Sequence, residues 1–227
     1  MARKSFLFNR EPLWVENRSC TRHTLPENVQ SWVYEPGSLT QRLRDYYGDA
    51  IGVKILLQQW NVPFLTERRL LKLHENKYSL IREVLLHADG KPLILARTII
   101  PASTIKVAKS NLAHLGSRPL GEVIFSYPKL ERIEMDVTLI DPSTTAWADI
   151  SLHAKSAPPP SLWVMQEIDT QSRRFRRRME QLPTWTQSAI DEVNINQPIW
   201  GRRTVYAIAQ RQMLVSEFFL PEVLEIF

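Results

Sequence analysis

The chain has 227 residues, of which 44% are hydrophobic and 23% charged, which is typical of a globular protein with one well-filled core. A formal net charge of +5 suits nucleic acid, an anionic membrane or acidic small molecules and selects none of them. The single cysteine, Cys20, excludes an intramolecular disulfide, and no Cys and His residues have zinc-binding spacing. With no signal-peptide pattern and no apolar stretch of transmembrane length, we expect a cytoplasmic protein.

Two helices are predicted near the start of the chain. Helical spacing after Thr24 aligns the apolar residues Leu25, Val29, Trp32 and Val33. Ser38 is followed three residues later by Gln41, a capping-box pattern that predicts the start of a second helix. We expect this helix to bury Leu39, Leu43 and Tyr46 or Tyr47.

The next segments are predicted strands. From Ile51, apolar side chains alternate on one face at Val53, Ile55 and Leu57, and polar residues 58 and 59 end the run. The clearest signal is the stretch 79–101, in which two apolar runs flank Asp89-Gly90, a dipeptide preferred in two-residue hairpin turns. This pattern predicts a β-hairpin.

The pattern is less regular after this hairpin. Ser103 or Thr104 is expected to cap a short helix that ends near Gly116, and residues 118–121 predict a turn into an apolar segment. Residues 137–197 contain Pro158-Pro159-Pro160 and few alternating apolar positions, so we interpret them as an insertion. Alternation returns at Trp200 and predicts a second hairpin whose turn contains residues 210–212.

Three charged residues interrupt apolar faces of the predicted strands, because side chains alternate between the two faces of a strand. Arg82 shares its face with Leu80, Val84 and Leu86, Arg97 with Leu93, Leu95 and Ile99, and Glu217 with Met213, Val215 and Phe219. A buried carboxylate is costly unless it is paired or protonated. Two arginines against one glutamate leave a positive charge, which a site for a carboxylate would use. A self-satisfied structural ion cluster is the alternative interpretation.

The hairpin turn also predicts how the arginines are paired. Arg82 and Arg97 are equally distant from Asp89-Gly90, so a regular two-residue turn would place them opposite one another, unless Pro92 disturbs the register. Facing guanidinium groups destabilise a strand pair, and they cannot deprotonate to escape this cost. We therefore expect an anionic group between or above them.

The order of several segments resembles the chorismate lyase (chorismate pyruvate-lyase) family. These segments are SLTQRL from Ser38, IREVLLHADGKPLILARTIIPAST from Ile81, LGSRPLGEVIF from Leu115, WGRRTVY from Trp200 and SEFFLP from Ser216. The resemblance covers residues 25–136 and 198–221 and leaves the stretch 137–197 as an insertion. It implies one α+β domain over residues 1–227, with an antiparallel six-stranded sheet, helices, and two helix-containing flaps that close over a buried ligand site.

The resemblance also implies the site. Carried over residue by residue, Arg82 is similar to the arginine that binds the ring carboxylate, Arg97 to a second active-site arginine, and Glu217 to the active-site glutamate. These three would be the catalytic residues, and all three would contact the substrate. Backbone groups at Leu120 would contact the same carboxylate. Leu39 stands where some relatives have a methionine at the ligand, and this departure conserves shape.

The implied reaction converts chorismate to 4-hydroxybenzoate and pyruvate, without metal or redox cofactor, as the first committed step of ubiquinone synthesis. Chorismate carries two carboxylates, which two arginines would match. In this hypothesis Arg97 stabilises charge on the departing enolpyruvyl group and Arg82 fixes the ring. Glu217 either orients the C4 hydroxyl or acts as a base at C4. The resemblance implies a monomer.

Other interpretations remain open at this stage. A non-catalytic carboxylate-binding domain is the main alternative, because related folds serve as effector-binding modules in transcription regulators. We expect no nucleic-acid partner, since neither a recognition helix nor a stacking platform is evident. The arginine run Arg173–Arg178 is interpreted as a solvated segment, with a transient contact to a membrane or a prenyltransferase as the alternative. Framework or surface roles are favoured for Arg202 and Arg203, with a contribution to the positive potential of the site as the alternative.

Overall fold

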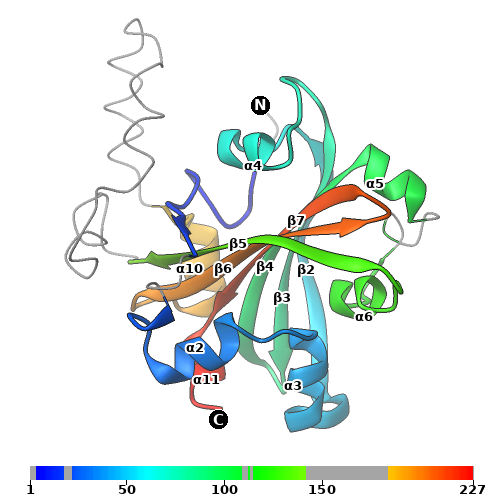
Figure 1. Cartoon of the computed structure of the whole chain (residues 1–227). Coiled ribbons are helices and arrows are strands. Elements are labelled where there is room, and N and C mark those ends of the chain that lie inside the picture. Colours follow the sequence, from blue (N-terminus) through cyan, green and yellow to red (C-terminus); the bar gives the residue numbers. More distant parts are fainter. Residues whose placement is uncertain (1–3, 18–21, 109–111, 113–114, 142–183, 227) are drawn as a thin grey trace, which may run out of the picture.

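The computed structural model describes residues 4–17, 22–108, 112, 115–141 and 184–226. The strands of this part of the chain form one antiparallel sheet in the order β1-β5-β6-β7-β4-β3-β2 (Figure 1). They are β1 Val15–Glu16, β2 Ile51–Asn61, β3 Ser79–Ala88, β4 Lys91–Pro101, β5 Leu130–Ile140, β6 Ile199–Ile208 and β7 Arg211–Phe219. The single α+β domain is confirmed. The expected six strands are seven, because the two-residue β1 pairs with β5 at one edge.

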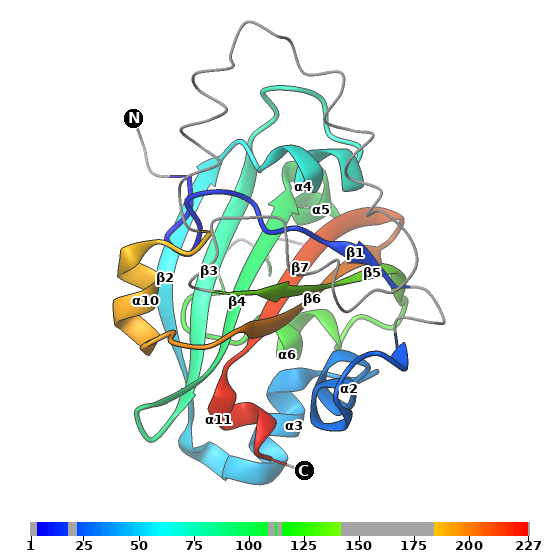
Figure 2. The ribbon, with the colours of Figure 1, turned by 90° about the vertical axis from the view of Figure 1, so that its left-hand side faces the viewer.

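Short helices cover the sheet and lie toward different sides of it. Helices α2, α3, α6 and α11 gather near one another, whereas α10 and the N-terminal segment lie away from them (Figure 2). The helices are α2 Glu27–Val33, α3 Leu39–Tyr47, η1 Gly48–Ala50, α4 Leu65–Leu70, α5 Ala102–Val107, α6 Leu120–Ile124, α10 Gln187–Val193 and α11 Pro221–Leu224. No helix in these described ranges is long and apolar enough to cross a membrane.

The second predicted helix begins as its sequence indicates. The Ser38 side chain accepts a hydrogen bond from the backbone N–H of Gln41 at 3.3 Å and so caps α3. The reciprocal half of a capping box is not formed, because the Gln41 amide donates to Asp45 instead. Leu39 and Leu43 are buried as expected, which fixes the first turn of α3 against the core.

The β3–β4 hairpin has the predicted turn but not the predicted register. Asp89 and Gly90 both have positive φ, as a type I′ turn requires. Leu86 pairs with Ile94 and His87 with Pro92, so Leu93 is an extra residue in β4. A one-residue bulge turns every later side chain to the other face. Arg82 therefore pairs with Thr98 instead of Arg97, and the two arginines lie on opposite faces.

A second bulge changes the face of β2. Ile55 pairs with Val84 and Leu57 with Glu83, which leaves Leu56 without a partner. The predicted single apolar face over residues 53–57 is therefore wrong, and Ile55 is 42% exposed. Residues 58 and 59 lie within β2 and do not end it. β2 is an edge strand, and polar residues are common on such strands.

The structure describes the C-terminal hairpin and part of the predicted insertion. The β6–β7 turn consists of Ala209 and Gln210, both at positive φ, one residue before the predicted position. Of the stretch 137–197, residues 137–140 complete β5, and Trp185 and Ala189 are buried in the core. Residues 142–183 lie outside the described part of the chain, and the run Arg173–Arg178 lies there too.

Candidate active site

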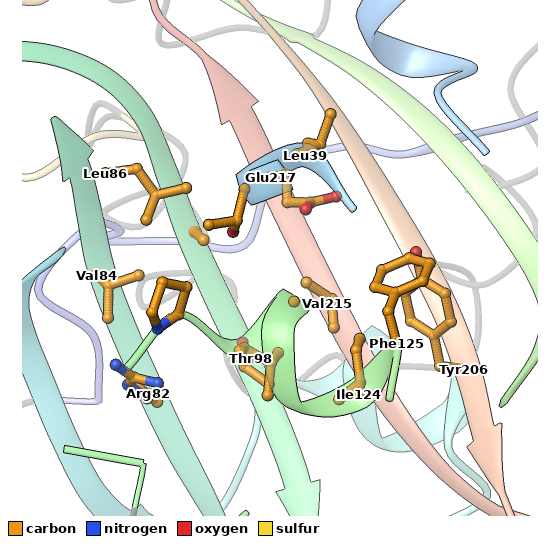
Figure 3. Close-up of a pocket in the computed structure, with 15 residues that line it drawn as sticks. Leu39, Arg82, Val84, Leu86, Thr98, Ile124, Phe125, Tyr206, Val215 and Glu217 are labelled. Atoms are coloured by element: carbon orange, nitrogen blue, oxygen red, sulfur yellow. The ribbon is translucent and has the colours of Figure 1, made fainter. Parts of the chain in front are cut away.

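A pocket lies between the centre of the sheet and helices α3 and α6. Strands β3, β4, β6 and β7 form its floor, and we call this side of the sheet the pocket face and the other the back face. The pocket is lined by Leu39, Thr40, Arg82, Val84, Leu86, Ala96, Thr98, Pro119, Leu120, Gly121, Ile124, Phe125, Tyr206, Val215 and Glu217. Most of these side chains are apolar, and Figure 3 shows Arg82 and Glu217 extending from different strands toward the same space.

Arg82 is a buried cation whose charge is not neutralised by any salt bridge among the described residues. Its Nη1 and Nη2 atoms donate to the backbone carbonyl of Arg118 at 3.2 Å, and Nη2 also donates to that of Gly116 at 2.9 Å. Its Nε has no hydrogen-bond partner among the residues that the structure describes. Burial lowers the pKa of Arg82, but an arginine remains charged in proteins. Such a cation at the wall of a pocket suits an anionic ligand.

Glu217 is paired, and its partner is Arg202, for which the sequence favoured a framework or surface role. Arg202 stands directly opposite Glu217 in the β6–β7 register, and its Nε lies 2.6 Å from Glu217 Oε2. The Glu217 side chain is 15% exposed and the Arg202 side chain 1% exposed, so the glutamate lies between the arginine and the pocket. Within the described residues no hydrogen bond reaches Oε1, which leaves this oxygen as an acceptor for a ligand.

Helices α3 and α6 contribute the other two predicted residues. Leu39 is the first residue of α3 and Leu120 the first residue of α6, and both line the pocket. The helices pack closely, since a Cβ atom on Gly121 would lie 2.5 Å from Ser38 Oγ. A salt bridge between Arg44 and Glu122 joins their outer sides. The two helices thus cover the pocket face together, as the expected helix-containing flaps would.

Tyr206 adds a polar atom to the pocket that sequence reasoning missed. Its ring lines the pocket beside Phe125, with 6.0 Å between the ring centroids (Figure 3). Its hydroxyl accepts a hydrogen bond from Arg132 Nη2 at 3.1 Å. Burial raises the pKa of Tyr206, and the nearby Glu217 carboxylate raises it further. A tyrosine on an apolar strand gives no sequence signal of this kind, because it is also an ordinary core residue.

Arg97 does not line the pocket. It lies on the back face and is 2% exposed. Its Nε and Nη2 atoms form a two-pronged salt bridge with Glu67 at 2.6 and 2.9 Å, and Nη1 donates to Glu83 at 2.6 Å. Its guanidinium also lies over the Phe64 ring, 4.6 Å from the centroid. Two carboxylates therefore surround Arg97, which corrects the expectation that it faces Arg82.

The cluster around Arg97 ties the N-terminal segment to the sheet. Glu83 accepts hydrogen bonds from Ser5 Oγ and from the backbone N–H groups of Phe6 and Leu7. Glu11 accepts from the side chain and backbone of Thr66 at the start of α4. Burial raises the pKa of Glu11 to about 7, and the nearby Glu67 carboxylate contributes to this increase.

The structure thus brings four of the five predicted site residues into one pocket, namely Leu39, Arg82, Leu120 and Glu217. The fifth, Arg97, is separated from them by the sheet. Among the buried and half-buried charged side chains described on the strands of the pocket face, there are still two arginines and one glutamate, because Arg202 takes the place expected for Arg97. The predicted excess of positive charge is therefore retained, and it resides on Arg82.

Comparison with solved structures gives only weak likenesses. PhnF from Mycobacterium smegmatis aligns with a TM-score of 0.49 and 11% identity, over 83% of this chain and 66% of that chain. A GntR-family transcriptional regulator from Bacillus cereus aligns with a TM-score of 0.45 and 12% identity, over 77% and 94% of the two chains. At this level of similarity neither structure indicates what this chain binds.

Comparison with curated sequences gives a much stronger result. The protein named "Probable chorismate pyruvate-lyase" of Methylococcus capsulatus is 35% identical over 87% of this chain and 98% of its own length. A protein of the same name from Aromatoleum aromaticum is 31% identical over 90% of this chain and 91% of its own length. The family model for chorismate lyase matches residues 10–159. The chain therefore belongs to the chorismate lyase family.

Proposed function

We propose that this protein is a lyase that converts chorismate to 4-hydroxybenzoate and pyruvate in the pocket between Arg82 and Glu217. One observation carries the proposal: within an apolar pocket, an unneutralised arginine and a carboxylate with an available oxygen extend from different strands toward the same space. A ring with a carboxylate at one end and a hydroxyl at the opposite end matches these two groups. Family membership supports this choice of substrate.

The pocket favours one orientation of the ring. The ring carboxylate would bind Arg82, with backbone N–H groups at Leu120 as further donors, since the first N–H groups of a helix lack intrahelical partners. The C4 hydroxyl would then donate to Glu217 Oε1. Val84, Leu86 and Val215 would contact the ring from the sheet, and Leu39 from α3.

The chemistry needs no oxidant. The C3–O bond breaks and its electrons leave with the enolpyruvyl group, while the C4 hydrogen departs as a proton and its electrons complete the aromatic ring. The enolpyruvate takes up a proton at carbon and becomes pyruvate, so the overall reaction is an elimination. In this proposal Glu217 either holds the C4 hydroxyl or receives the C4 proton.

Arg97 is left out of this chemistry, because its donors are occupied by Glu67 and Glu83 on the back face. We assign it a structural role in joining α4 to the sheet. The second arginine of the pocket face, Arg202, is bound to Glu217 and does not line the pocket. The idea that two free arginines receive the two carboxylates of chorismate is therefore replaced by one free arginine, Arg82.

We also propose a pathway, a compartment and an oligomeric state for this protein. A supply of 4-hydroxybenzoate would serve ubiquinone synthesis, and the chain would act as a cytoplasmic monomer that needs no cofactor. These statements rest on the family resemblance and on the features of the sequence described above.

Incubation of the purified protein with chorismate tests the proposal. Pyruvate and 4-hydroxybenzoate should accumulate in equal amounts, at a rate proportional to the protein concentration and above the spontaneous decay of chorismate. Glu217→Gln protein, purified in the same way, controls for a contaminating lyase. Tight binding of chorismate without turnover would refute the lyase and support a carboxylate-binding domain instead.

A further inference from the structure

Arg202 is the residue through which Glu217 is held in the pocket. The two residues face one another across β6 and β7, and the Arg202 Nε atom lies 2.6 Å from Glu217 Oε2. Because one carboxylate oxygen is bound, the plane of the carboxylate is fixed and Oε1 is left for the ligand. Without the contact to Arg202, the flexible Glu217 side chain would sample several rotamers.

The Arg202 guanidinium is itself fixed from its other side. Its Nη1 atom donates to the backbone carbonyls of Trp32, Val33 and Glu35, at 3.3, 3.0 and 3.0 Å. Trp32 and Val33 are the last residues of α2, and Glu35 lies just beyond its end, where the helix carries partial negative charge and favours a cation. Arg202 therefore cannot follow a moving Glu217 without losing these contacts, so the pair has one geometry.

The position of Arg202 excludes direct contact with the ligand as its main role. It is 1% exposed and does not line the pocket. Burial would lower its pKa, but Glu217 and neighbouring groups outweigh this effect and raise it. Its charge is thus permanent, and any effect of this charge on the reaction has to pass through Glu217.

This inference rests on the proposed function: we propose that Arg202 is a positioning residue that orients the Glu217 carboxylate toward the C4 position of the substrate. The other charged or titratable groups near this carboxylate are Tyr206 beside it, Arg132 bonded to Tyr206, Glu35 near Arg202, and Arg82 across the pocket. Lysine cannot replace Arg202 fully, because one ammonium group cannot reach the carboxylate and three carbonyls in the same planar geometry.

The adjacent arginine offers a matched control. Arg203 is also buried, but it points to the back face, where its Nε donates to Asp136 at 3.0 Å and its guanidinium lies over Trp14. Arg202→Lys and Arg203→Lys each replace a buried, paired arginine in the same strand. They differ in the face of the sheet on which the change is made.

The test compares kcat and KM for pyruvate formation from chorismate in the wild type and both variants. We expect Arg202→Lys to lower kcat by about 10- to 100-fold, in line with a weakened charged hydrogen bond. Its KM should change by less than about threefold, because Arg202 does not line the pocket and the donors of Arg82 are kept. Arg203→Lys should keep both kcat and KM, even if its Tm falls.

A double variant makes the test independent of folding losses. Arg202→Lys/Glu217→Gln should be no more than about threefold slower than Glu217→Gln alone, because Arg202 acts through the Glu217 charge. Multiplicative losses in the double variant, or equal effects of the Arg202 and Arg203 variants, would overturn the proposal. An inactive wild type would instead refute the lyase function itself, so the two failures are distinguishable.

Discussion

At the scale of single residues, the pocket depends on how each buried charge is neutralised. Among the described residues, Arg82 has only backbone carbonyls as hydrogen-bond partners, whereas Glu217 has Arg202 and Arg97 has two glutamates. A buried cation without a counter-charge costs free energy, and an incoming carboxylate recovers it. The unneutralised residue is therefore the one that selects an anion.

Replacing Glu217 by Gln keeps the shape of the side chain and removes its charge. We expect kcat/KM for chorismate to fall at least about tenfold, because a charged hydrogen bond to the C4 hydroxyl is lost. A fall of roughly 10³-fold or more would indicate that Glu217 also takes the C4 proton. Steady-state pyruvate release measures this change, and a value within twofold of the wild type would remove Glu217 from the site.

Glu11 makes stability depend on pH. Its pKa is raised to about 7 in the folded protein by burial, so the fold favours the protonated form. The resulting stabilisation is complete below the unfolded pKa of 4.5 and is lost as the pH rises through about 7. The free energy of unfolding should therefore decrease by a few kcal/mol, on the order of 2–3, between pH 5 and pH 8.

Urea denaturation at several pH values checks this dependence. Glu11→Gln should abolish most of the slope, and Glu131→Gln, at an exposed position on β5, should leave it unchanged. An unaltered slope in Glu11→Gln would show that other groups cause the pH dependence.

Arg82 and Glu217 could be predicted from the sequence because each stands on an otherwise apolar strand face, a pattern that needs only the two-residue period. Arg202 could not be identified in this way, since adjacent arginines in a strand do not reveal which one has a carboxylate opposite. Its partner is fixed by the β6–β7 register, and this depends on a turn that begins one residue before the predicted position.

At the scale of elements, two short helices close the pocket through one tight contact. Gly121 in α6 lies against Ser38, the residue that caps α3. Leu39 and Leu120 are the neighbouring residues that enter the pocket. The spacing of the two helices therefore determines how far apart these two leucines lie.

Gly121→Ala should weaken this contact. The added Cβ would lie 2.5 Å from Ser38 Oγ, so either the Ser38 side chain rotates away and loses its cap on α3, or the two helices separate, at a cost of about 1–3 kcal/mol. Thermal denaturation should show a lower Tm, and calorimetry a weaker affinity for 4-hydroxybenzoate. Ser38→Gly in the same background removes the clashing oxygen and should restore most of both, since glycine is acceptable at an N-cap. If Gly121→Ala alone were as stable as the wild type, the close contact between Gly121 and Ser38 would be contradicted.

The bulge at Leu93 explains why Arg97 was misplaced. The sequence predicts both ends of the β3–β4 hairpin and its turn. The extra residue, Leu93, gives no sequence signal other than the neighbouring Pro92. The short helix α4 was also missed, because its burial depends on Glu67 pairing with Arg97 across 30 residues of sequence. Long-range pairs of this kind are not visible in local periodicity.

At the scale of the whole molecule, the sheet separates two buried clusters of charge. The back face contains Glu67, Glu83 and Arg97, which join α4 and the N-terminal segment to the sheet. The pocket face contains Arg82, Glu217 and Arg202, and in the part of the chain that the structure describes only Arg82 of the two arginines has no carboxylate partner. The charges of the back-face cluster are paired with one another, whereas Arg82 in the pocket-face cluster can pair with an anionic ligand.

This separation predicts that substitutions of similar chemistry have different effects on the two faces. Arg82→Lys removes the paired donors offered to the substrate, whereas Arg97→Lys weakens a structural cluster on the other side of the sheet. The loss of donors at Arg82 should appear in substrate affinity and turnover. The change at Arg97 should appear in the Tm.

The most direct measurement is kcat/KM for chorismate in these two variants, each shown by circular dichroism to be folded at the assay temperature. We predict a fall of about 100-fold for Arg82→Lys and a change of less than about threefold for Arg97→Lys. A large loss for Arg97→Lys together with near-normal turnover for Arg82→Lys would contradict the assignment of the reaction to the pocket face.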